Sequence, residues 1–431
     1  MTQIPKVSGF DQTVSLLREG YDFLPRRFER MTTDILEARF GLQKAICLRG
    51  HDAAELFYDS NRFQRRGAAP RRVKAILFGR GGVQNLDGEI HRQRKAMFMS
   101  LMDRASIDRL VERLEQHWRG AVVRWGERSQ VKLLIEARKV LTRAVCEWAG
   151  VPLDDNDVEQ RATQLAKLVD GASGVGPRYW EGRLARIQTE AWALKIVEKI
   201  RDRRLEAPTG SAAHVVACHR EDGKLLPPRV AAVELLNVLR PVVAIDRYIA
   251  FTALALHEHA SLLDDTHAFV QEVRRYYPFF PVLAARVRTE FEWRGYRFPK
   301  GRRVVLDIYG TNHDRRLWDD PETFRPERFH GRELDAFTLI PQGGGDHYLN
   351  HRCAGEWITI AVMTAAVRLL TREMSYQVSA QDLRIDHGRI PARPPSDFLI
   401  EAVKPVAPEL HEKHEKHEKH EQHEEPFPKA L

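Results

Sequence analysis

The sequence contains little cysteine and no paired arrangement of it. Only four cysteines occur in 431 residues, and no two of them stand at CxxC or zinc-ligand spacing. Single, widely separated cysteines predict free thiols in a reducing compartment and exclude a disulfide-stapled secreted scaffold. We expect three of the four to be packing or surface residues without chemistry: Cys47, Cys146 and Cys218.

The sequence also has no long hydrophobic run. Residues 1–20 carry charged side chains without an apolar core, which predicts that they are neither a signal peptide nor a membrane anchor. The most apolar stretch, residues 242–256, is interrupted by Asp246 and Arg247 and is too short to cross a bilayer. We therefore expect a cytoplasmic protein without a membrane anchor.

Charge of one sign is not concentrated in the body of the chain. The formal net charge is +8, but lysine and arginine are scattered and no nucleic-acid-binding module accompanies them, so nucleic acid is not an expected partner. The end of the sequence repeats His-Glu-Lys in a low-complexity pattern. We expect residues 409–431 to be a disordered tail without a catalytic role, and residues 1–408 to form a single domain.

Helical periodicity dominates the chain, and strand-like segments are short. In residues 103–125, Leu110, Leu114 and Trp118 recur on one face of a helix. Residues 229–263 are apolar on most sides, which predicts one long helix buried through the middle of a large domain. The pattern indicates a mainly α fold with a small β-sheet region. Further helices are expected at 132–149, 158–169 and 183–205, and strands at 45–48, 287–291, 296–298 and 304–308.

One cysteine stands in a different context from the others. Cys353 lies between the glycine-rich segment 341–345 and the apolar, helix-like segment 357–363. A thiolate near a helix N-terminus is stabilised by backbone N–H groups and the helix dipole. Glycines allow the backbone to pass close to a large flat ligand, because no Cβ stands in the way. These features favour a haem ligated by the Cys353 thiolate; the alternative is a buried structural cysteine in a glycine-rich turn.

Two further motifs precede Cys353. Glu272 and Arg275 stand at i and i+3, where they can pair on one helix face. Downstream, a Pro-Glu-Arg-Phe segment supplies Arg328. Each motif is common alone, but in this order the three resemble the cytochromes P450. The resemblance extends over residues 24–404. It implies the cytochrome P450 fold, structural roles for these three charged residues, and haem b with Cys353 as the axial ligand of iron.

Two departures narrow the resemblance. The long central helix has no acid–threonine pair of the kind that delivers protons to dioxygen, and residues 237–245 read Asn-Val-Leu-Arg-Pro-Val-Val-Ala-Ile. The cysteine loop has extra residues between Gly345 and Cys353. Both features are similar to the bacterial fatty-acid peroxygenase family, which comprises α/β-hydroxylases and alkene-forming decarboxylases. The resemblance implies hydrogen-peroxide-dependent hydroxylation of long-chain fatty acids at the α or β carbon, without an obligatory redox partner.

Arg240 and Pro241 are the candidate catalytic pair in that helix. Proline removes a helix hydrogen bond and kinks the helix, which can turn Arg240 toward a cavity. A buried arginine without an anion is costly, and its planar fork suits a bidentate carboxylate. The resemblance implies that Arg240 holds the fatty-acid carboxylate, which acts as general acid/base in place of the missing acid residue. The alternative is that Arg240 pairs with a protein acid, Glu234 or Asp246.

The segment that contains Gln84 supplies the remaining candidates on the distal side. This residue matches a position that the family occupies with glutamine in hydroxylating members and with histidine in the alkene-forming decarboxylase. Because an amide cannot donate a proton as an acid, Gln84 favours hydroxylation. Candidates for contacts to the haem propionates, which need cationic or donor partners, are His91, Lys95, Arg286 and His351.

Phe78, Val169 and Phe280 are candidates for an apolar channel around the acyl chain, with plain core as the alternative. Other functions stay open beside the peroxygenase. A decarboxylase that forms terminal alkenes shares the same motifs, and a monooxygenase fed by a redox partner is disfavoured by the missing acid–threonine pair. A haem sensor or a fatty-acid carrier would bind both ligands without turning anything over.

Overall fold

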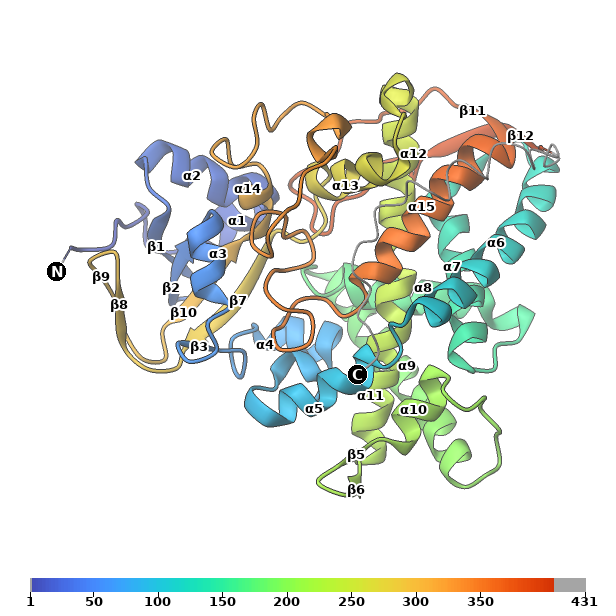
Figure 1. Cartoon of the computed structure of the whole chain (residues 1–431), viewed down its shortest axis with the longest axis horizontal. Coiled ribbons are helices and arrows are strands. Elements are labelled where there is room, and N and C mark those ends of the chain that lie inside the picture. Colours follow the sequence, from blue (N-terminus) through green and yellow to red (C-terminus); the bar gives the residue numbers. More distant parts are fainter. Residues whose placement is uncertain (1, 407–431) are drawn as a thin grey trace.

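The computed structural model describes residues 2–406, about half of which are helical. Figure 1 shows the main sheet on one side of the molecule and most of the long helices on the other. The helices are α1 (Thr13–Glu19), α2 (Phe23–Met31), α3 (His51–Phe57), α4 (Arg71–Val73), α5 (Gly88–Met99), α6 (Arg104–Gly126), α7 (Leu133–Ala149), α8 (Val158–Asp170), α9 (Pro177–Arg201), α10 (Ala212–Cys218), α11 (Pro228–Val243), α12 (Asp246–His259), α13 (Thr266–Tyr276), α14 (Ile308–Asn312) and α15 (Glu356–Arg372). The strands are β1 (Ile35–Phe40), β2 (Gln43–Leu48), β3 (Phe63–Gln64), β4 (Val131–Lys132), β5 (Arg220–Glu221), β6 (Lys224–Leu225), β7 (Val282–Val287), β8 (Phe291–Trp293), β9 (Tyr296–Phe298), β10 (Arg303–Asp307), β11 (Met374–Val378) and β12 (Leu399–Pro405).

Helix α6 shows why the sequence pattern predicts the helices well. The side chain of Asp103 caps its N-terminus by accepting a hydrogen bond from the backbone N–H of Ser106, 2.9 Å away. Leu110, Leu114 and Trp118 are fully buried against the core, as their helical spacing predicts. The observed helix differs from the predicted one by a single residue at each end.

The prediction of one long helix over residues 229–263 is wrong, because two helices occupy this stretch. Helix α11 ends at Val243 and α12 begins at Asp246. Pro241 has no N–H to donate to the carbonyl of Asn237, and the chain tightens immediately after it: Ile245 N donates to Val242 O at 3.1 Å, an i to i−3 bond. The two helices follow one another through the middle of the molecule (Figure 1).

The main sheet has the strand order β1-β2-β10-β7-β3. Strands β2 and β10 are parallel, and the other neighbouring pairs are antiparallel. In the middle of the sheet, Val304 pairs with Ile46 on one side and with Ala285 on the other, and all three side chains are buried. The short strand β3 brings the chain directly to Arg65, next to the candidate site described below.

Within residues 2–406, no helix is long and apolar enough to cross a membrane. The mainly helical class with a small sheet region is confirmed. The predicted tail, residues 409–431, lies outside the described residues, so the division into a domain of residues 1–408 and a tail stays a prediction.

Candidate active site

Cys353 stands at the start of α15, two residues before its N-cap, Gly355. Its backbone N–H donates to the carbonyl of Gln342 at 3.0 Å, which closes the glycine-rich loop onto the cysteine. Gly343 has a φ of +94°, and a Cβ there would lie 2.6 Å from the hydroxyl of Tyr58, so this position requires glycine. Cys353 is half-buried. Burial raises the pKa of its thiol, and the charge of Lys95 opposes that effect.

The amide of Gln342 is directed at the sulfur. Its Nε2 lies 3.8 Å from Cys353 Sγ and 2.9 Å from Thr359 Oγ1. Arg274 donates to the Oε1 of the same amide at 3.1 Å. Because arginine has only donors, this contact fixes which end of the amide is oxygen, and the N–H groups must face the sulfur and the threonine.

Glu356 anchors this arrangement. It accepts hydrogen bonds from Arg274, from Arg352 at 2.6 Å and from His347 at 3.1 Å. Burial alone would raise the pKa of Glu356, but the charges of Arg274 and Arg352 and the His347 hydrogen bond hold it well below its usual range. The buried carboxylate therefore ties the cysteine loop to α13 and α15.

In the haem-loaded protein, Gln342→Leu removes an N–H donor from the thiolate, so the sulfur donates more strongly to iron and the ferric state is favoured. We expect about a tenfold shift in the ferric/ferrous equilibrium, a potential about 59 mV more negative. Potentiometric titration measures it. Thr359→Val removes the other acceptor but leaves the N–H···S contact, so its potential should stay unchanged; an unchanged potential in Gln342→Leu would contradict the assignment.

A group of basic side chains gathers near Cys353. The rings of His91 and His351 stack with their centroids 3.8 Å apart, and Lys95 donates to the backbone carbonyl of Arg352. Burial lowers the pKa of His91 to about 4 and that of Lys95 to about 8. Burial and the nearby charge of Arg65 also lower the pKa of His351.

This basic group is not neutralised by ion pairs within residues 2–406. Among the described residues, no carboxylate forms an ion pair with His91, Lys95, His351 or Arg65, although all four are wholly or largely removed from water. Buried basic groups without counter-ions fit the propionates of a haem, and the half-buried thiolate fits its iron. The residues present therefore suit a haem next to Cys353 and this basic group.

Arg240 is another buried cation that forms no ion pair within residues 2–406. It is 6% exposed, and its Nη2 donates to Asn237 Oδ1 at 3.3 Å, while its Nε has no partner. Burial and repulsion from Arg186 lower its pKa to about 9. The two acids that the sequence offered as partners of Arg240 form ion pairs with other arginines. Glu234 pairs with Arg94 at 2.5 Å, and Asp246 pairs with Arg138 and Arg247.

Asn237 connects Arg240 to Gln84. Its amide nitrogen donates to Glu234 at 2.7 Å and lies 3.3 Å from Gln84 Oε1. Glu234 also accepts from the backbone N–H of Val83 at 2.9 Å. The central helix and the turn Val83–Asn85 are thus held together by one buried carboxylate, with Arg240 and Gln84 on the same network.

The comparisons with known proteins agree with this geometry. The family model for cytochrome P450 matches residues 244–400. Cytochrome P450SP alpha (CYP152B1) in complex with (R)-ibuprophen is 49% identical, with a TM-score of 0.90, and the match covers 92% of this chain and 99% of that one. Cytochrome P450EX alpha (CYP152N1) with myristic acid is 44% identical, with a TM-score of 0.92, over 94% of this chain and 100% of that one. A variant of cytochrome P450 OleT in complex with arachidonic acid is 33% identical, with a TM-score of 0.91, over 94% and 99%.

This chain is a cytochrome P450. Its similarity to CYP152 structures also confirms the resemblance to the fatty-acid peroxygenase family within the P450 superfamily. The P450 fold predicted from the sequence is confirmed, and membership of the family implies a haem iron ligated by cysteine.

The charged motif residues of the P450 pair with one another. Arg275 donates two hydrogen bonds to Glu272, at 2.6 and 2.7 Å, and Arg328 lies 3.3 Å from the same carboxylate. Glu272 also accepts from the backbone N–H of Arg325 at 2.8 Å. This cluster fixes α13 to the segment that follows α14.

One predicted propionate contact of the P450 has other partners. Arg286 is not with the basic group, because its guanidinium donates to the carbonyls of Gly67 and Gly301 at 2.7 Å each. Arg65, which no sequence motif marks, stands there in its place. Val169 belongs to a buried core cluster and Phe78 packs against it, whereas Phe280 lies outside that cluster and is 37% exposed.

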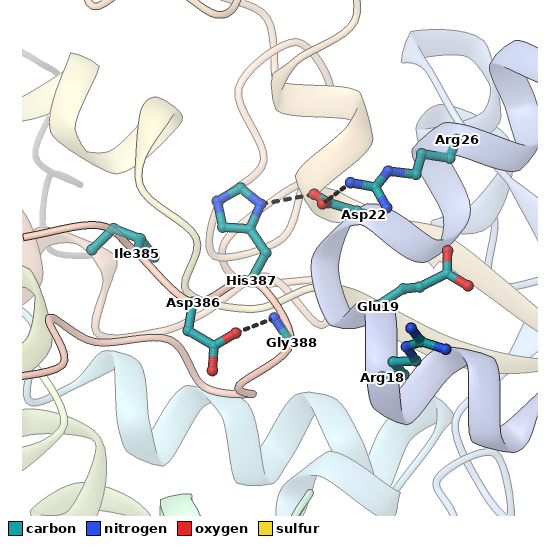
Figure 2. Close-up of a pocket in the computed structure, with 8 residues that line it drawn as sticks. All are labelled: Arg18, Glu19, Asp22, Arg26, Ile385, Asp386, His387 and Gly388. Atoms are coloured by element: carbon teal, nitrogen blue, oxygen red, sulfur yellow. Dashed lines mark hydrogen bonds and ion pairs between the residues drawn. The ribbon is translucent and has the colours of Figure 1, made fainter.

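A separate open hollow of about 480 Å³ lies between the N-terminal helices of the P450 and residues 385–388 (Figure 2). Asp22 pairs there with Arg26 and with His387, at 2.7 Å each. Its charges are largely paired with one another and no predicted site residue lines it, so we assign it no role.

Proposed function

We propose that this P450 uses hydrogen peroxide to hydroxylate long-chain fatty acids at the α or β carbon. The observation that carries the proposal is Arg240, a buried guanidinium without an anionic partner among the described residues. A cation in this state is stabilised by an incoming carboxylate, and its planar fork binds one bidentately. The structures with myristic acid and arachidonic acid support a carboxylic-acid substrate.

The substrate carboxylate would transfer the proton that an acid–threonine pair transfers in other P450s. Haem b ligated by Cys353 supplies the oxidising iron when bound. Glu234 and Asp246 both form ion pairs with arginines, so neither carboxylate is available to transfer a proton next to Arg240. A carboxylate held by Arg240 can accept a proton from one peroxide oxygen and return it to the other as water leaves. The overall reaction converts the fatty acid and hydrogen peroxide to hydroxy acid and water.

Regiochemistry and product follow from the same contacts. A carboxylate fixed at Arg240 places the first carbons of the chain nearest the reacting centre, which favours the α and β positions. The amide of Asn237 donates to Gln84 Oε1 at 3.3 Å and so holds the Gln84 side chain in this network, and the Gln84 amide is not an acid. This favours hydroxylation over decarboxylation. Phe78 and Val169 are proposed contacts of the acyl chain.

The proposal is tested by incubating the haem-loaded protein with myristic acid and hydrogen peroxide, without a reductase, and analysing products by mass spectrometry. We expect α- or β-hydroxymyristic acid. A terminal alkene one carbon shorter would assign the protein to the decarboxylases. Product that appears only with an electron donor and a redox partner would indicate a monooxygenase, and no product at all from intact haem would indicate a sensor or carrier.

A further inference from the structure

The outer face of α9 carries an exposed apolar strip. Trp180, Leu184 and Ile187 stand at i, i+4 and i+7 and are 69%, 57% and 60% exposed. Val175, in the connection that leads into α9, is 50% exposed and extends the strip. The opposite face of the helix packs against α8 and α11, so the strip is the side of α9 that the described chain leaves uncovered. Contiguous exposed apolar side chains of this size mark an interaction surface.

Arginines without carboxylate partners flank the strip. Arg72 donates to the carbonyl of Gly174 at 3.0 Å and lies over the ring of Tyr179, Arg183 donates to the carbonyl of Ala75 at 2.7 Å, and Arg178 donates to the carbonyls of Asp170 and Ile390. Backbone carbonyls do not neutralise charge.

Few acids oppose these arginines. Among the described residues, no ion pair is formed by Arg72, Arg178 or Arg183, nor by the exposed Arg71 beside them. Glu181 is the acid nearest in sequence, and Lys167 engages it at 3.4 Å. The surface thus combines an apolar strip with uncompensated positive charge.

We propose that this face of α9 docks the protein on an anionic lipid surface. Tryptophan and leucine on one side with arginine around them is the composition of helices that lie in the plane of a membrane interface. Anionic headgroups supply the missing negative charge. A second copy of the chain fits less well, because a two-fold contact through this face would bring the same arginines of both copies together.

Docking there would place the connection between α8 and α9 at the lipid. That connection begins directly after Val169 and Asp170, at the end of the helix that contributes a proposed contact of the acyl chain. Ser173 Oγ donates to the carbonyl of Ile390 at 2.5 Å, so the connection is also attached to the C-terminal segment. Fatty acids partition into bilayers, so docking would bring the substrate close to the end of α8 that carries Val169.

The test is co-sedimentation of the haem-loaded protein with vesicles of phosphatidylcholine alone and of phosphatidylcholine with about 30% phosphatidylglycerol. We expect several-fold tighter binding to the anionic vesicles, weakened by salt. Leu184→Ser should lower that binding about fivefold, while Val123→Ser, which removes an equally exposed (56%) apolar side chain on α6, should leave it unchanged. Arg71→Gln with Arg72→Gln should remove most of the preference for anionic vesicles, about fivefold per charge.

Absence of binding to anionic vesicles, equal binding to both compositions, or equal losses in the Leu184 and Val123 variants would each overturn the proposal. So would a dimer in solution that Leu184→Ser dissociates without any lipid binding. The assay needs no turnover, and its outcome is therefore independent of the proposed peroxygenase activity.

Discussion

Replacing Arg240 with leucine is expected to lower peroxide-driven turnover of myristic acid by about 10²–10⁴-fold while the protein keeps its haem. The variant loses the charged partner of the substrate carboxylate and, with it, the only positioned proton-transfer group in the proposed mechanism. Because Arg240 forms no ion pair within residues 2–406, its removal strands no protein carboxylate. Product formation per haem, measured by mass spectrometry, gives the effect.

Haem content and the ferrous–CO absorption band serve as the internal control for Arg240→Leu, because both report on Cys353 and not on the carboxylate site. Arg240→Lys is the matched variant. It keeps a positive charge but loses the planar fork, so it should retain part of the activity with a raised KM. Turnover of Arg240→Leu equal to that of the unchanged protein would remove Arg240 from the mechanism.

The fold follows from the sequence where local patterns decide the structure. The helix predicted at residues 103–125 was placed within one residue, because its cap and its apolar face both lie within the helix itself. The prediction of one long helix over residues 229–263 is wrong because the apolar periodicity continues through the break after Pro241. The consequence of a missing N–H for the next turn does not show in a hydrophobic pattern.

The candidate site also contains residues that the sequence indicates and residues that it does not. Cys353 and Arg240 lie in motifs that can be read along the chain. The residues around them do not lie in such motifs. Arg274 bonds to Gln342, 68 positions further along the chain, and Arg65, which directly follows the two-residue strand β3, lies near the two histidines. Asn237 is one helical turn before Arg240, and that i, i+3 spacing is the signal that could have identified it.

Removing the charge of Glu272 is expected to have the largest effect on stability. Glu272→Gln leaves Arg275, which is 1% exposed, without its counter-ion, and it also weakens the contacts to Arg328 and to the backbone of Arg325. Breaking a buried ion pair from one side costs about 3–5 kcal/mol, because the remaining charge stays desolvated. The free energy of unfolding, taken from the shift in the urea midpoint of the haem-loaded protein, measures this loss.

Asp108→Ala is the matched control for Glu272→Gln. Asp108 also pairs with an arginine on its own helix, Arg104 at 2.9 Å, but both side chains are more than half exposed. Water screens such a pair, so its loss should cost less than about 1 kcal/mol. Equal effects of the two variants would mean that the Glu272 cluster is no more than a surface ion pair. A large effect of Glu272→Gln alone, with the ferrous–CO band intact at low urea, would show that the cluster stabilises the fold without taking part in the chemistry of the haem.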